Sequence, residues 1–182
     1  LKDDGKSKDI RAKYLAHIAT MFELHGDKPE EARRAASRIL ALETALAKAS
    51  LSRVDRRDPR KQFHKVDARG LAGLTPSFDW VAYQKALGLE PQATFNVTQP
   101  AFYKELERQW KVLSLADVKA YLRWHAVSAT APYLARAFVN ANFEFYSKTL
   151  RGVPELRPRW KRCVALVDGQ LGEALGREFV ER

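Results

Sequence analysis

The sequence predicts an all-α protein. Apolar residues recur three and four positions apart along most of its 182 residues, which is the period of a helix that buries one face. Only residues 94–97 have the β-branched and aromatic composition of a strand. One strand of that length cannot form a sheet alone. We therefore expect an array of about seven helices with at most one short strand, near residues 94–97.

Two helices are predicted to form an antiparallel hairpin over residues 4–51. The inner face of the first helix is marked by Ile10, Tyr14, Ile18 and Phe22. This helix ends near Gly26, and Asp27 followed by Pro29 supplies the cap and the early proline that open a second helix. The second helix turns Ile39, Leu42, Leu46 and Ala49 inward.

A connector and five further helices account for the rest of the chain. Residues 52–70 are highly charged and contain Pro59, so they form a connector with room for one short helix. Ser77 is expected to cap a helix that ends at Gly88. Four later helices follow from the apolar spacings Phe102–Leu113, Leu115–Ala126, Leu134–Phe145 and Leu156–Leu175. The second of these helices opens at a capping box, Ser114–Asp117, and is expected to face inward through Leu115, Val118, Leu122 and Ala126.

Breaks between these helices are also encoded. Pro132 separates two of them, and Gly152 with Pro154 ends the next. We expect a single helical domain over residues 1–182, in which the hairpin 4–51 packs on residues 67–182.

The composition is basic, and the charge is concentrated. The chain carries 32 Lys and Arg against 22 Asp and Glu, a net charge of +10. Residues 52–70 and 151–162 hold most of this excess, which is a pattern that nucleic-acid-binding proteins share. Acidic residues such as Asp55 and Asp58 are interleaved with the basic ones, and this favours local salt bridges over a phosphate track. A nucleic-acid-binding module stays the alternative. The sequence contains no segment of the roughly 20 apolar residues that a membrane span needs.

The histidines and serines predict neither a metal centre nor a nucleophile. No two histidines are four residues apart, and His17 and His25 would lie about 12 Å apart along one helix. Two ligands of one zinc ion must each lie about 2 Å from it. His125 follows Trp124 on a face expected to point inward, which favours a packed, hydrogen-bonded histidine. We therefore assign no catalytic and no metal-ligating residue.

Three smaller signals remain. Cys163 follows Lys161 and Arg162, which can activate a thiol, but a small buried apolar residue beside Val164 is the favoured interpretation. Glycines at 169, 172 and 176 predict the close approach of a neighbouring helix. Asn96 begins a glycosylation sequon, which matters only in a secreted eukaryotic protein.

Several segments resemble the neprilysin and endothelin-converting-enzyme family of zinc metalloendopeptidases, which includes bacterial oligopeptidases. The most specific is Arg157–Val164, with its tryptophan, basic residues and cysteine. The others are Gly172–Arg177, Phe179–Glu181, Arg57–Pro59, Phe78–Trp80, Val97–Tyr103 and Asn142–Tyr146. The resemblance covers nearly the whole chain. Phe63 and His64 stand where many relatives have tyrosine and asparagine.

The resemblance implies two largely helical lobes around a central cavity, with zinc in a catalytic lobe that carries a His-Glu-x-x-His helix. That motif is absent from this sequence, so the chain is similar to the non-catalytic region that caps the cavity and limits substrates to short peptides. The implied partners are the catalytic lobe of the same parent chain and peptide substrates. Cys163 matches a family cysteine that pairs, in extracellular relatives, with a cysteine outside this chain. The family implies an extracellular or periplasmic location.

The two ends of the sequence agree with this interpretation. The chain opens at Leu1 without methionine, and residues 176–182 are still in helical register at its close. We therefore expect a piece of a longer peptidase, inactive alone. An all-α scaffold domain with no link to proteolysis is a further alternative.

Overall fold

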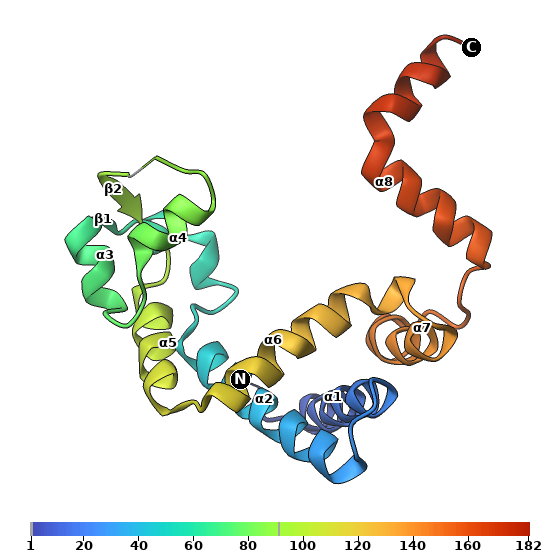
Figure 1. The fold of residues 1–182 in the computed structure, drawn as a ribbon, viewed down its shortest axis with the longest axis horizontal. Helices are drawn as coiled ribbons and strands as arrows, with labels where there is room; N and C mark the ends of the chain where they lie inside the picture. The colour runs from blue at the N-terminus through green and yellow to red at the C-terminus, as the bar shows by residue number, and fades with distance from the viewer. Residues whose placement is uncertain (1, 91) are drawn as a thin grey trace. The chain divides into compact units, whose positions relative to one another are not determined.

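The computed structural model describes residues 2–90 and 92–182, and it confirms the all-α prediction. In these residues eight α-helices alternate with short 3-10 turns and one two-stranded sheet (Figure 1). The chain divides into two compact units, Leu1–Thr130 (unit 1) and Ala131–Arg182 (unit 2). The assignment of residues 1–182 to one domain stays a prediction.

Unit 1 opens with α1 (Gly5–Leu24) and α2 (Pro29–Ala49), which lie side by side and pack on each other (Figure 1). Gly26 has φ 108°, a left-handed conformation that costs glycine little, and the chain reverses there. The side chains that these two helices bury include Ile18, Met21, Phe22, Ile39, Leu42 and Leu46. Five members of the predicted inner faces are therefore buried, and Ile10, Tyr14 and Ala49 are half-buried.

Asp27 does not cap α2, contrary to expectation. The N-cap residue is Lys28, which makes no side-chain capping bond. The Asp27 carboxylate instead accepts two hydrogen bonds from Arg123, at 2.8 and 2.5 Å. A bidentate, charge-assisted pair is stronger than a neutral cap. The side chain is therefore used to hold α6 against the hairpin turn.

The helix α6 (Leu115–Thr130) contacts both α1 and α2. Its opening capping box is confirmed, because the Asp117 amide donates to the Ser114 hydroxyl oxygen and the Ser114 amide donates to the Asp117 carboxylate. The predicted inner face is wrong, since Leu115 and Leu122 are 70% and 63% exposed. Trp124 is buried instead and meets Tyr14, His17 and Phe22 edge-on.

The reason is geometric. At about 100° per residue, Leu122 lies roughly 200° around the helix from Trp124. Only one of the two can face α1, and the larger side chain occupies that position.

The connector is more structured than expected. It holds two 3-10 turns, Asp55–Arg57 and Pro59–Gln62, then strand β1 (Lys65–Asp67) and helix α3 (Ala68–Leu74). Strand β2 (Thr94–Asn96) pairs antiparallel with β1, with Val66 opposite Phe95. The prediction of at most one strand is therefore wrong. The segment Lys65–Asp67 lacks a sequence pattern typical of a strand, and it forms a strand because it pairs with β2.

Two helices complete unit 1, α4 (Trp80–Ala86) and α5 (Pro100–Val112). Asp79, not Ser77, caps α4, because its carboxylate accepts a hydrogen bond of 2.8 Å from the Ala82 amide. Ser77 is engaged by α5, as described below.

Unit 2 begins with a 3-10 turn, Ala131–Tyr133, at the predicted break. Helix α7 (Arg136–Asn142) continues into a π-helical segment, Phe143–Thr149, and Gly152 ends it with φ 71°. Helix α8 (Arg159–Val180) has non-helical dihedral angles at Leu171. None of the helices in residues 2–90 and 92–182 combines the length and apolar character that a membrane crossing requires.

His17 makes the stability of unit 1 depend on pH. Burial lowers the pKa of its imidazole from 6.5 to about 4, because the cation would lie beside the Trp124 ring without bulk water. The unfolded chain therefore binds a proton between pH 6.5 and 4 that the folded chain does not. Stability is full above pH 6.5 and falls as the pH drops through 4, by about 1–3 kcal/mol.

Urea titrations at pH 7 and pH 4 check this expectation. His17→Phe keeps an aromatic ring in the same position and removes the titrating group. Its free energy of unfolding should therefore fall less between the two pH values than that of the unsubstituted chain. Equal losses in the two proteins would contradict the assignment to His17.

Candidate functional site

The structure separates the four histidines. His17 is buried in α1, His25 ends that helix, His64 precedes β1, and His125 meets the Tyr121 ring edge-on at 4.5 Å. His125 is exposed, so the expectation that it packs inward is wrong. In the part of the chain that the structure describes, no group of three or more His, Cys, Asp or Glu side chains could hold a metal ion. The residues that are described thus do not fit a zinc ion.

Two acidic residues of the basic connector make local contacts. Asp55 pairs with Lys61 and accepts a hydrogen bond from Ser52. The hydrogen bond with Lys61 lowers the pKa of the Asp55 carboxyl and raises the pKa of the Lys61 ammonium. Asp58 accepts a hydrogen bond of 2.9 Å from the Arg60 amide and so caps the second 3-10 turn. The interleaved acids therefore form local contacts, as the sequence indicates.

A partly exposed aromatic cluster lies in unit 1, on α4, on α5 and in the turn before α4. Its rings meet edge-on or tilted at centroid distances of 4.7–6.0 Å, and they are Phe78, Trp80, Tyr83, Phe102 and Tyr103. The Trp80 indole nitrogen donates a hydrogen bond of 2.8 Å to the Thr75 hydroxyl. Phe78 and Tyr83 are 41% and 46% exposed, so the cluster presents ring surface to whatever adjoins this face.

Glu107 of α5 holds the turn that carries these rings. Its carboxylate accepts hydrogen bonds from the Ser77 amide, at 3.1 Å, and the Ser77 hydroxyl, at 2.8 Å. Lys111 pairs with it at 3.1 Å. Burial raises the pKa of Glu107, but the hydrogen bonds from Ser77 and Lys111 outweigh burial and the net pKa is lowered. The side chain is therefore an ionised, buried clamp between α5 and the 75–79 turn.

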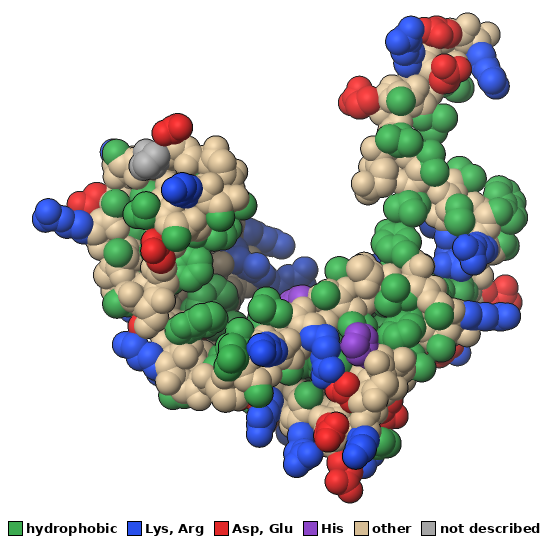
Figure 2. Space-filling view, viewed as in Figure 1, with side chains coloured by type: hydrophobic (Ala, Val, Ile, Leu, Met, Phe, Trp, Pro, Cys, Tyr) green, Lys and Arg blue, Asp and Glu red, His purple; other side chains and the backbone are tan. Residues whose placement is uncertain are grey.

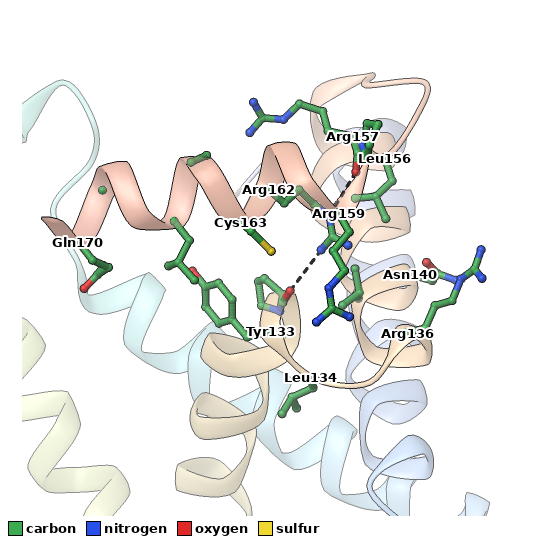
Figure 3. Close-up of a pocket in the computed structure, with 16 residues that line it drawn as sticks. Tyr133, Leu134, Arg136, Asn140, Leu156, Arg157, Arg159, Arg162, Cys163 and Gln170 are labelled. Atoms are coloured by element: carbon green, nitrogen blue, oxygen red, sulfur yellow. Dashed lines mark hydrogen bonds between the residues drawn. The ribbon is translucent and has the colours of Figure 1, made fainter. Parts of the chain in front are cut away.

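Unit 2 contains a groove of about 1070 Å³ (Figure 3). One wall is formed by residues 132–140 and the other by residues 156–170, at the start of α8. Cys163 lines it and is exposed, so the favoured interpretation of Cys163 as a buried apolar residue is wrong. Four arginines also line the groove, namely Arg136, Arg157, Arg159 and Arg162.

The opposite side of α8 carries an apolar stripe. Its members recur at helical spacing and are Trp160, Val164, Val167, Leu171 and Leu175, each between 46% and 64% exposed. Figure 2 shows the apolar side chains gathered along this helix. The glycines at 169, 172 and 176 do not adjoin another helix, since a Cβ added to any of them would meet no described atom within 4 Å.

Sequence reasoning missed the groove, although one of its walls lies in a basic stretch. The segment Arg157–Arg162 is basic in the sequence, but Arg136 lies more than twenty residues before Arg157. Only the turn at 131–135 and the loop at 150–158 bring the two walls together. The remaining candidate residues, including Asn96 and the histidines, do not converge on one site.

Comparisons with known proteins agree with this architecture. The profile described as Peptidase family M13 matches residues 1–182. Endothelin-converting enzyme 1 is 29% identical in both Rattus norvegicus and Homo sapiens, over 97% of this chain and 24% of each enzyme. The zinc metalloprotease Zmp1 of Mycobacterium tuberculosis is 38% identical over 99% of this chain and 28% of its own. The TM-scores are 0.89 for its open state and 0.90 for its inhibitor complex.

This is the helical N-terminal region of a metallopeptidase. The chain belongs to peptidase family M13, the zinc-dependent family of neprilysin and the endothelin-converting enzymes. It spans about a quarter of the length of the relatives it matches.

The Glu107 clamp can be tested by substitution. Glu107→Ala leaves the Ser77 amide and hydroxyl without their acceptor, so unit 1 should lose about 1–3 kcal/mol of stability. Urea unfolding followed by tryptophan fluorescence measures the loss. The matched control is Glu178→Ala, an exposed glutamate of α8, which should change stability by less than about 0.5 kcal/mol. Similar losses in both variants would show that Glu107 is no clamp.

Proposed function

We propose that this chain is the cavity-capping region of a zinc metalloendopeptidase of family M13 that hydrolyses short peptides. The observation that carries the proposal is the match of the family profile to residues 1–182, in a chain that spans only a quarter of its relatives. In this proposal the region limits substrate size and excludes bulk water from the cavity. Its partners are the catalytic lobe of the same parent chain and the peptide substrates.

In this proposal the hydrolytic reaction takes place in the catalytic lobe, outside this chain. Zinc, if held in the catalytic lobe of the parent, would supply Lewis-acid chemistry, and that lobe lies outside this chain. The described residues supply neither zinc ligands nor a general base placed beside such ligands. The proposed contribution of this region is a rigid cap that limits substrate size. Its helices are held at fixed positions by contacts such as Arg123 with Asp27 and Glu107 with Ser77.

The first test uses the purified chain. It should contain no stoichiometric zinc after dialysis against zinc and should cleave no peptide, because its described residues offer no cluster of ligands. Elemental analysis and a fluorogenic peptide assay measure the two quantities. One zinc ion per chain together with peptide hydrolysis would contradict the proposal.

The second test uses the intact peptidase. Asp27→Ala breaks the bidentate pair that holds α6 to the hairpin turn, so the capping region should admit longer substrates. The ratio of kcat/KM for an unfolded protein to kcat/KM for a short peptide should rise about threefold, which corresponds to roughly 0.7 kcal/mol.

The matched control is Asp9→Ala, which removes an exposed pair with Lys13 on α1 and should leave the ratio unchanged. If Asp27→Ala changes kcat/KM equally for the unfolded protein and the short peptide, this region does not select substrates by length.

A further inference from the structure

The groove in unit 2 is electrostatically incomplete. Its lining includes four arginines and no aspartate or glutamate. Among the described residues none of these arginines forms an ion pair. The Arg162 guanidinium donates hydrogen bonds to two neutral acceptors, the carbonyl oxygens of Arg157 at 3.2 Å and Pro132 at 3.4 Å. The positive charge of the groove is therefore not balanced from within.

Several arginines of unit 1 are paired with carboxylates. Arg123 pairs with Asp27, Arg38 with Asp117 and Arg108 with Glu105, each at 2.5–2.6 Å. The four groove arginines lie on two segments that a loop brings together. Cations that line one groove repel one another, and a carboxylate bound there offsets that repulsion.

The floor of the groove is apolar. Tyr133, Leu134, Val139, Leu156 and Leu166 line it, and Tyr133 and Leu134 are 63% and 42% exposed. Figure 3 shows Cys163 and Arg162 of α8 facing the turn that carries Tyr133. An apolar floor rimmed by arginines fits an amphipathic segment with acidic side chains, and it suits neither a basic nor a purely polar ligand.

We propose that this groove seats an acidic amphipathic segment of the same peptidase, from the part of its chain that lies outside residues 1–182. The inference rests on the proposed function, because it takes the chain to be part of a longer peptidase. Two observations select this occupant. The charge and apolar character of the groove define its chemistry, and about three quarters of the length of the relatives lies outside the region that this chain matches.

Cys163 reports on occupancy of the groove. It is the single cysteine of the chain and lines the groove, so its alkylation by N-ethylmaleimide reports on this position alone. The probe is a synthetic amphipathic peptide of leucine and glutamate, and its counterpart replaces every glutamate with lysine. At about ten times its Kd, the glutamate peptide should slow alkylation about tenfold, because only the unoccupied groove reacts. The lysine peptide should not slow it.

Charge reversal tests the arginines. Arg136→Glu with Arg159→Glu should weaken binding of the glutamate peptide about tenfold. Both residues stand first in their helices, where a carboxylate is compatible with the helix. The matched control is Arg33→Glu with Arg34→Glu, two exposed arginines of α2 with the same change in net charge. Equal protection by both peptides, or equal effects of the two double variants, would overturn the proposal.

The intact peptidase separates a structural occupant from a substrate. The Arg136 and Arg159 double variant should lower Tm relative to the Arg33 and Arg34 control and leave the KM for acidic peptides unchanged. A raised KM for acidic peptides at unchanged Tm would make the groove a substrate site and overturn the proposal. Neither readout uses the length preference of the enzyme, so a failure here is distinguishable from a failure of the proposed capping role.

Discussion

The burial of Trp124 of α6 against α1 is the interaction on which unit 1 depends. The indole is 1% exposed and touches rings from three turns of α1. The preceding residue, Arg123, lies 4.4 Å from the centroid of the Phe22 ring and pairs with Asp27. Large buried aromatic residues contribute about 3–5 kcal/mol, against a total stability of roughly 5–15 kcal/mol for a domain. The positions of the hairpin and of α6 are therefore coupled through two adjacent side chains.

Sequence reasoning succeeded where local periodicity decides the structure. The helices of the hairpin, the capping box at Ser114 and the break at Pro132 depend on residues within one or two turns, and all are present. It failed at Asp27 and Ser77 for a shared reason. Each has a side chain suited to capping the next helix, and each is used instead by a residue far along the chain, Arg123 and Glu107. Local propensity cannot anticipate that competition.

The same limit applies to unit 2. Periodicity along α8 identifies the apolar stripe from Trp160 onward, but it cannot identify what covers it. Around the helix, Cys163 and Leu166 face the groove, while Val164 and Val167 lie on the other side. On α8 one face lines the groove and another carries the exposed apolar stripe. A helix with two such faces is typical of a segment that packs between other parts of a larger protein. The family assignment accounts for this, because most of an M13 peptidase lies outside this region.

The pair between Arg123 and Asp27 also has a consequence for synthesis of the protein. The two residues are 96 positions apart, and a ribosome adds about 5–20 residues per second. The α1–α2 hairpin can form as soon as it emerges, but for about 5–20 seconds it lacks the α6 residues that cover its aromatic side. During that interval Tyr14 and Phe22 are open to chaperones or to a neighbouring nascent chain. The order of translation thus leaves the first two helices partly uncovered until α6 has been made.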